Sequence, residues 1–407
     1  MSLLKRLADF FALKRSMIAM LGMVILVGMG ERMAERFLPI YLMALGGGAI
    51  TIGLLGGLQN LLGALYSFPG GYLSDRIGIK KALLVFNLMA MIGFGIVILF
   101  PSIYAVLVGA LFFIAWSAIS LPAIMALVAR VLPLSKRTMG VSVHSLVRRV
   151  PMAFGPIVGG LFISAWGEVR GVRLAFGAAI LMAVVAAVMQ QVMIESEHSS
   201  EKSAEDSTPE KNPLKAFRLL NPDLRNLLVS DILIRFCEQI PYAFAVVWAM
   251  KTIASPVSAV EFGVLTTVEM ATSALCYIPV AYWADKTAKK PFVVITFVFF
   301  TVFPLMLLVS HSFWPLVLAF FVRGLKEFGE PTRKALILDL APKGREAAVF
   351  GLYYLIRDTI VSLAAFGGAL LWLISPATNF LVAFVFGLAG TIWFAVRGRD
   401  LTTRQRV

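Results

Sequence analysis

Ionisable side chains interrupt long apolar stretches of this sequence, and they are the residues whose types and spacing could do chemistry. A charged group at the depth of a bilayer is unfavourable, so each must face a partner or a water-filled cavity. Such groups can bind a charged solute or relay a proton, or they can neutralise one another as buried structural pairs. The candidates for solute binding or coupling are Glu31, Arg32, Glu35, Arg36, Asp231, Arg235, Glu238, Glu269, Arg323, Lys326, Glu327, Glu330, Arg357 and Asp358.

A short pattern of opposite charges occurs twice. Arg32 and Glu35 share a helix face at i, i+3 spacing, and Arg235 and Glu238 repeat this arrangement in the second half of the chain. Two arginines at matching positions suit an anion site built from both halves. Glu269 differs, because no basic residue lies within a helical turn of it along the sequence. We therefore expect Glu269 to be the acid best placed to take up a proton.

Composition identifies the surroundings of these groups. Of the 407 residues, 59% are hydrophobic and 15% are charged, whereas roughly one-quarter of the residues in soluble domains are charged. Stretches of about 20 apolar residues, enough to cross a bilayer as a helix, recur along the chain. We expect twelve transmembrane helices, near residues 16–44, 51–72, 82–100, 103–131, 139–166, 172–193, 226–253, 260–283, 291–309, 313–340, 347–374 and 379–396.

Basic residues predict the orientation of these helices. If the N-terminus is cytoplasmic, most Lys and Arg outside the spans fall in cytoplasmic segments, and only Arg170 and Arg173 fall in a periplasmic loop. The positive-inside rule then predicts a multi-pass protein of the inner membrane with both termini in the cytoplasm. The formal net charge of +14 reflects this topology, so we expect no nucleic-acid partner.

A polar segment near the middle divides the chain. Residues 195–211 read ESEHSSEKSAEDSTPEK, a composition that cannot bury itself and is typical of a flexible linker. We therefore expect an all-α membrane protein of two pseudo-symmetric six-helix bundles, residues 1–194 and 225–407, joined by a cytoplasmic linker at 195–224. Internal repeats support this organisation, since Asp75 returns as Asp285 and Gly159 returns as Gly368.

The loop after the second expected span carries the most specific motif. Residues 71–84 read GYLSDRIGIKKALL, in which Gly71 allows close helix approach and Gly78 permits unusual backbone angles. Asp75 can accept hydrogen bonds from a neighbouring helix N-terminus. The stretch resembles the signature G-x-L-a-D-r-x-G-r-k-x-x-l of the major facilitator superfamily. That resemblance implies a secondary transporter that works by alternating access.

The resemblance also implies that this loop acts in gating. Asp75 would contact helix eleven across the two halves, and the contact would break as the protein opens to the cytoplasm. A topology loop with a turn glycine would explain the basic residues here but not Asp75. Arg130 stands where the second half has Asp339, so we expect Arg130 to pair with Asp75. The gating candidates are Gly71, Asp75, Arg76, Gly78, Lys81, Arg130 and Asp285.

Two further motifs bear on direction and coupling. Residues 155–160, Gly-Pro-Ile-Val-Gly-Gly, resemble the G-P-x-x-G-G core found in superfamily members that export solutes in exchange for protons. Small residues let helices pack closely, so ordinary packing is the alternative explanation. Glu35-Arg36-Phe37 resembles the end of the E-x-x-E-R-F motif of proton-coupled oligopeptide transporters, although Glu31 lies one residue too far away. The helix-packing candidates are Gly155, Pro156, Gly159 and Gly160.

Three functions remain open from the sequence. The first is proton-coupled export of an amphipathic metabolite or drug, and the second is import or exchange of an organic anion. The third, a non-transporting receptor or a membrane-embedded enzyme, has no catalytic or nucleotide-binding motif to support it. We expect a monomer in the lipid bilayer that binds a small-molecule substrate and a coupling proton, without enzymatic activity, cofactor or metal.

Overall fold

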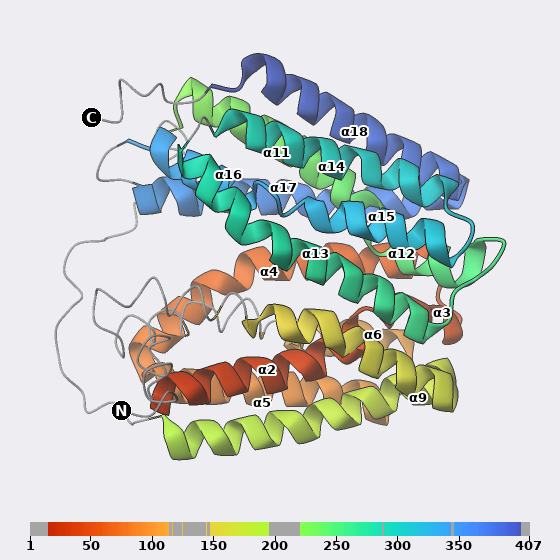
Figure 1. The fold of residues 1–407 in the computed structure, drawn as a ribbon. Helices are drawn as coiled ribbons and strands as arrows, with labels where there is room; N and C mark the ends of the chain where they lie inside the picture. Colours follow the sequence, from red (N-terminus) through yellow and green to blue (C-terminus); the bar gives the residue numbers. More distant parts are fainter. Residues whose placement is uncertain are drawn as a thin grey trace, which may run out of the picture. The chain divides into compact units, whose positions relative to one another are not determined.

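The computed structural model describes residues 15–113, 116, 124, 144, 147–194, 220–286, 289–342 and 346–399. These residues are predominantly helical and include no strand (Figure 1), in agreement with the predicted all-α class. The helices are α2 (Arg15–Glu35), α3 (Leu38–Ala44), α4 (Ala49–Ile77), α5 (Ile79–Leu99), α6 (Ile103–Phe113), α9 (Arg149–Met193), α11 (Pro222–Tyr242), α12 (Phe244–Val247), η1 (Trp248–Thr252), α13 (Ala259–Lys286), α14 (Lys290–Val309), α15 (Phe313–Leu325), α16 (Glu330–Leu340), α17 (Glu346–Ile374) and α18 (Pro376–Arg397).

The chain forms two compact units. The first turns of α4 belong to the second unit, and the first turns of α13 belong to the first unit, unlike in the sequence-based division. The two bundles and the linker at 195–224 therefore stay a prediction. Unit 1 comprises Met1–Gly48, Leu62–Glu201 and Ser258–Thr267, and unit 2 comprises Ala49–Leu61, Lys202–Val257 and Val268–Val407.

Glycines set the packing of α9 in unit 1, where this helix lies along α2. A Cβ atom on Gly155 would lie 2.7 Å from the Cβ of Arg32, and one on Gly159 would collide with the carbonyl of Met33. Gly160 approaches the backbone of the first residue of α13 just as closely. Gly155 and Gly159 therefore allow α9 to lie close to α2, the helix that carries Arg32.

The repeat reproduces this packing in unit 2. There α11 packs against α17 and α18, and α14 packs against α18. Gly368 of α17, the counterpart of Gly159, lies so close to α11 that a Cβ atom would collide with the carbonyl of Ile240. Gly159 in unit 1 and Gly368 in unit 2 therefore each pack closely against the helix that carries an Arg-x-x-Glu pair.

Two of the expected spans are interrupted near prolines. The span expected at 16–44 ends as α2 at Glu35 and resumes as α3, which has Pro39 in its first turn. The span expected at 226–253 ends as α11 just after Pro241, and α12 and η1 follow it. Proline lacks the N–H that would continue the helical hydrogen bonds. Broken helices in membranes leave backbone groups that need partners or water, so they tend to line cavities.

The span expected at 313–340 is also interrupted. It ends as α15 at Leu325 and resumes as α16 at Glu330, with a turn between them. The spans expected at 139–166 and 172–193 instead run together in α9, where Gly167 with φ 79° marks the kink between them. A positive φ suits glycine, which has no Cβ to clash.

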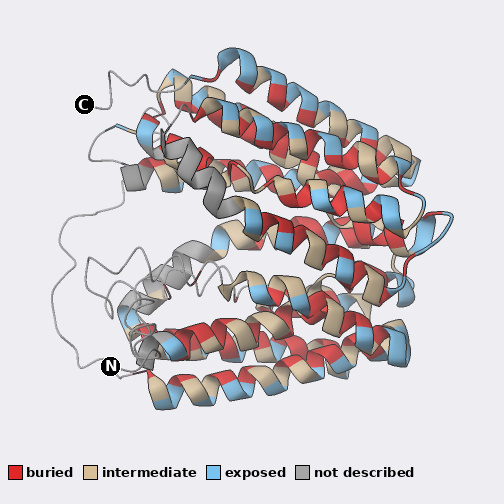
Figure 2. Cartoon of the chain, viewed as in Figure 1, coloured by how far each residue is buried: buried red, intermediate tan, exposed pale blue. Residues whose placement is uncertain are grey.

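Residue burial differs from that in a soluble protein in two respects. Large apolar side chains such as Leu181, Leu275 and Val309 are exposed, whereas Glu31, Asp231 and other charged groups are buried (Figure 2). Eight of the helices described are long and apolar enough to cross a membrane, and α6 and α15 are shorter apolar helices. This supports a multi-pass membrane protein. The count of twelve spans and the position of the termini stay predictions, since most of residues 114–143 lie outside the described ranges.

Candidate functional site

The first Arg-x-x-Glu pair forms a salt bridge at the C-terminal end of α2. Arg32 Nη1 lies 2.6 Å from Glu35 Oε2, and both side chains are largely buried. The pair forms because i, i+3 spacing places both side chains on one helix face. Arg36, in the turn that follows, is half-buried.

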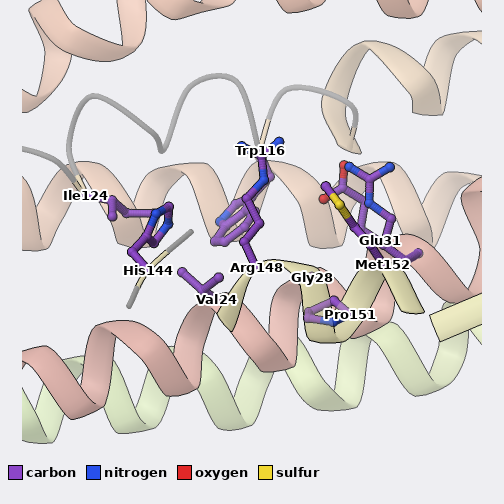
Figure 3. A pocket seen from close by; sticks show the side chains of 10 residues that line it. Val24, Gly28, Glu31, Trp116, Ile124, His144, Arg148, Pro151 and Met152 are labelled. Carbon is purple, nitrogen blue, oxygen red and sulfur yellow. The ribbon is translucent and has the colours of Figure 1, made fainter. Parts of the chain in front are cut away.

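A pocket in unit 1 lies beside this pair. Arg32 is part of its lining, together with Glu31 from the same helix and Arg148 from just before α9. Figure 3 shows Ile124 and His144 at one end of the pocket and Glu31 and Met152 at the other. The lining residues are Val24, Gly28, Glu31, Arg32, Trp116, Ile124, His144, Arg148, Pro151 and Met152.

The second Arg-x-x-Glu pair has the same geometry but more partners. In α11, Arg235 Nη1 lies 2.7 Å from Glu238 Oε2. Glu238 Oε1 also accepts a hydrogen bond of 2.8 Å from Lys326 Nζ. That same ammonium lies 3.2 Å from Glu269 of α13, and the Nε of Arg323 lies 3.1 Å from the same carboxylate oxygen. The two acids therefore share one lysine within unit 2.

A glycine brings the cations of α15 to Glu269. A Cβ atom on Gly324 would lie 2.6 Å from the carbonyl oxygen of Glu269 and from Thr272, so only glycine allows α15 to approach α13 this closely. Ser273 donates a hydrogen bond of 3.1 Å to the Gly324 carbonyl and holds the contact. Arg323 also lies over the ring of Phe303, 4.9 Å from its centroid, which adds a cation–π interaction.

A second ionic cluster surrounds Asp231. Its Oδ2 accepts hydrogen bonds from Arg333 Nη1, from the Tyr353 hydroxyl at 3.1 Å and from Arg357 Nη1 at 3.3 Å. Glu330 binds Arg333 at 2.7 Å and lies 3.4 Å from Nη2 of Arg235, the arginine that also binds Glu238. The two clusters of unit 2 therefore form one continuous network.

The structure changes the sequence-based interpretation of Glu269. Glu269 has no basic neighbour along its own helix, but α15 supplies Arg323 and the turn after it supplies Lys326. Its side chain is only 1% exposed, so these two cations replace solvent as its partners. Of the other candidates, Asp358 binds Arg357 at 2.7 Å, and Glu327 is half-buried in the turn after α15.

The gating candidates are described only in part. Gly78 has φ 86°, the unusual backbone angle predicted for it, and Arg76 and Lys81 are exposed. The structure describes the backbone at Gly71, Asp75 and Asp285, which is helical, but not their side chains. Arg130 lies outside the described residues altogether. The pairing of Arg130 with Asp75 therefore stays a prediction.

The second half supplies an ion pair at the corresponding turn. Lys289 Nζ lies 2.5 Å from Asp339 Oδ2 and joins the start of α14 to α16.

Sequence reasoning missed several polar groups of these sites, among them His144 in the pocket of unit 1. Tyr353 hydrogen-bonds to Asp231, and Trp116 lines the pocket of unit 1. Neither residue is charged, so the search for ionisable groups in apolar stretches passed over both. Among the described residues no group of His, Cys, Asp and Glu could hold a metal ion.

Known protein structures share this fold. A nucleoside transporter, NupG, is 12% identical with a TM-score of 0.79, over 94% of this chain and 100% of that chain. A peptide transporter of the POT family in complex with sulfate is 14% identical with a TM-score of 0.75, over 94% of each chain. A bacterial homologue of the human lysosomal transporter Spinster is 14% identical with a TM-score of 0.67, over 95% of this chain and 98% of that chain.

No curated protein matches the chain in sequence. The family model described as Major Facilitator Superfamily does match it, over residues 19–248 and again over residues 227–406. These matches cover nearly the whole sequence and both halves of the repeat. The chain is a membrane transporter that belongs to the major facilitator superfamily.

Proposed function

We propose that this protein is a secondary active transporter that exports a small amphipathic organic solute in exchange for protons. One observation carries the coupling part of the proposal: Glu238 and Glu269 share Lys326, at 2.8 Å and 3.2 Å. When one carboxylate takes up a proton, the ammonium keeps the other as its partner. The proton can therefore enter without leaving the buried ammonium of Lys326 unpaired, which would be strongly unfavourable.

The network offers a route by which protonation reaches other helices. Glu238 lies on α11, Glu269 on α13 and Lys326 just after α15, so a change of partner alters contacts between three elements. The three residues themselves all belong to unit 2. A proton bound at either acid would thus favour a different packing of these helices, which is what coupling requires.

The direction of transport and the topology belong to the same proposal. The resemblance of Gly155–Gly160 to the motif of proton-exchanging exporters supports export, and the close packing of these glycines on α2 is compatible with that role. The distribution of basic loops supports an inner-membrane protein of twelve spans with both termini in the cytoplasm. We propose that it acts as a monomer, since each unit has its own buried interior.

A second candidate is import or exchange of an organic anion. Arg32 and Arg148 line the pocket in unit 1, and guanidinium groups match the geometry of carboxylate and phosphate. The direction of the pH gradient that drives accumulation distinguishes the two candidate functions. Solute accumulates in proteoliposomes with an acidic lumen if protons are exchanged for it, and with an acidic exterior if protons accompany it.

The test compares wild type with Glu269→Gln in the same vesicles. Counterflow needs no gradient, so we expect Glu269→Gln to retain it while losing accumulation driven by a pH gradient. The matched control is Glu261→Gln on the same helix, where the acid caps the first turn by accepting from Ser258 N at 2.7 Å. Wild-type behaviour of Glu269→Gln in both assays would exclude Glu269 as the coupling acid. Loss of counterflow as well would assign it a structural or solute-binding role.

A further inference from the structure

A buried hydrogen-bond donor in the pocket of unit 1 has no protein partner among the described residues. Trp116 is 4% exposed, and its Nε1 finds no acceptor there. An indole N–H can only donate, so it needs an oxygen or another acceptor to bind. Most buried donors in folded proteins are satisfied. Because Trp116 lines the pocket, an occupant of the pocket can supply the missing acceptor.

The charges in the lining indicate what kind of acceptor this would be. Two guanidinium groups, Arg32 and Arg148, and one carboxylate, Glu31, contribute to it. Arg32 uses Nη1 to bind Glu35, and a guanidinium has five N–H donors in all. Among the charged side chains of the lining, the two cations therefore outnumber the one anion. A carboxylate, which accepts through two oxygens, complements this set better than a neutral group does.

Apart from His144, the rest of the lining is apolar. Val24, Ile124, Pro151 and Met152 present hydrocarbon or thioether surface next to the charged groups. Figure 3 shows Val24 and Trp116 between the His144 end and the Glu31 end of the pocket. A ligand that fits must therefore combine an anionic end with an apolar body.

From this combination we propose that the pocket in unit 1 binds a small amphipathic monocarboxylate. The carboxylate accepts a hydrogen bond from Trp116 Nε1 and pairs with the guanidinium groups of Arg32 and Arg148, while the hydrocarbon part contacts Val24, Ile124 and Met152. This assignment rests on the proposed transport function, because it names the solute class that the transporter recognises. It does not depend on the coupling acids of unit 2.

Binding to the purified full-length protein in detergent tests the assignment. The probes are acetate, butyrate, octanoate, benzoate and phenylacetate, each measured by titration calorimetry beside its neutral amide. We expect at least one carboxylate to bind wild type, and its amide to bind about tenfold more weakly or worse, as for the loss of a charge-assisted hydrogen bond. No binding by any carboxylate, or equal binding by the amides, would overturn the proposal.

Matched tryptophan variants identify the donor. Trp116→Phe keeps a ring but removes the N–H, and we expect about tenfold weaker binding of that carboxylate. The control is Trp393→Phe in unit 2, because Trp393 also has a buried Nε1 without an acceptor among the described residues but lies outside the pocket. Its affinity should stay within about twofold of wild type. Equal affinities of Trp116→Phe and wild type would overturn the role of the indole.

An arginine variant keeps the test decisive if Trp116→Phe does not fold. Arg148→Gln should remove the preference for carboxylate over amide, whereas the exposed Arg170→Gln should keep it. A preference unchanged in Arg148→Gln contradicts the proposal. These titrations involve no gradient, so carboxylate binding without proton-driven transport would contradict the proposed coupling alone. Proton-driven transport that ignores the carboxylate would contradict the pocket assignment alone.

Discussion

The two Arg-x-x-Glu pairs have the same spacing and almost the same ion-pair length, yet their surroundings differ. In unit 1, Arg32 binds Glu35 at 2.6 Å and borders the pocket in which Trp116 Nε1 has no acceptor among the described residues. In unit 2, the corresponding Glu238 also binds Lys326, and Arg235 also approaches Glu330. One pair thus faces space for a ligand, and the other is enclosed by protein ions.

The surroundings of the two pairs differ because neighbouring helices supply different residues. Unit 2 receives Arg323 from α15 and Lys326 from the turn after it, whereas residues 112–121 of the fourth expected span in the first half carry no charge and include Trp116. A duplicated sequence motif can therefore serve two roles, depending on what the neighbouring helices supply. We assign solute recognition to the pocket of unit 1 and proton coupling to the network of unit 2.

The largest expected effect comes from removing the central acid of the unit 2 network. Asp231→Ala leaves Arg333 and Arg357 buried beside each other without their shared carboxylate, which should lower the free energy of unfolding by about 3–5 kcal/mol. Reversible unfolding in mixed detergent micelles measures this loss.

The control for this variant is Asp358→Ala. The Asp358 side chain is 34% exposed and pairs only at the edge of the network with Arg357, so its loss should lower the unfolding free energy by less than about 1 kcal/mol. Similar losses for the two variants would mean that the Asp231 cluster is not a buried, interdependent network.

A smaller effect should follow from separating α15 from α13. Gly324→Ala places a Cβ atom 2.6 Å from the Glu269 carbonyl oxygen, and we expect about 1–3 kcal/mol of destabilisation together with weaker coupling to a pH gradient. Gly351→Ala is the control, because a Cβ atom there meets nothing within 4 Å. If Gly324→Ala kept both wild-type stability and wild-type coupling, the close approach would not be what positions Arg323 at Glu269.

The sequence predicted the helical class, the membrane environment and the family because these depend on local properties. Hydrophobic stretches of sufficient length form helices in a bilayer whatever their neighbours are. The break after α2 could not be predicted from the presence of Pro39 alone. Membrane helices often tolerate proline when nearby groups satisfy the freed carbonyls. Whether they do so depends on packing.

The partners of charged groups could be predicted only within one helix. The pairs Arg32–Glu35 and Arg235–Glu238 follow from i, i+3 spacing. The contact of Glu269 with Arg323 joins residues on two helices and depends on the close approach at Gly324, which the sequence does not specify. Trp116 carried no signal, since a tryptophan in an apolar stretch is ordinary. That its Nε1 has no acceptor among the described residues depends on its surroundings in the fold.

The central claim is that the two Arg-x-x-Glu pairs have different roles. The variants Glu35→Gln and Glu238→Gln test it, because they make the same chemical change in each pair. Both substitutions keep the shape of the side chain and remove one charge. We expect Glu238→Gln to keep counterflow but to lose at least about tenfold in gradient-driven transport, because Lys326 loses a partner of the coupling pair. Glu35→Gln should stay coupled but change the KM for the solute, because Arg32 at the pocket loses its ion pair.

The most direct measurement is the ratio of gradient-driven transport to counterflow for these two variants in identical vesicles. The account predicts that this ratio falls in Glu238→Gln and stays at the wild-type value in Glu35→Gln, with the change in KM confined to Glu35→Gln. The same change of ratio in both variants, or the reverse assignment, would contradict the division of roles between the two units.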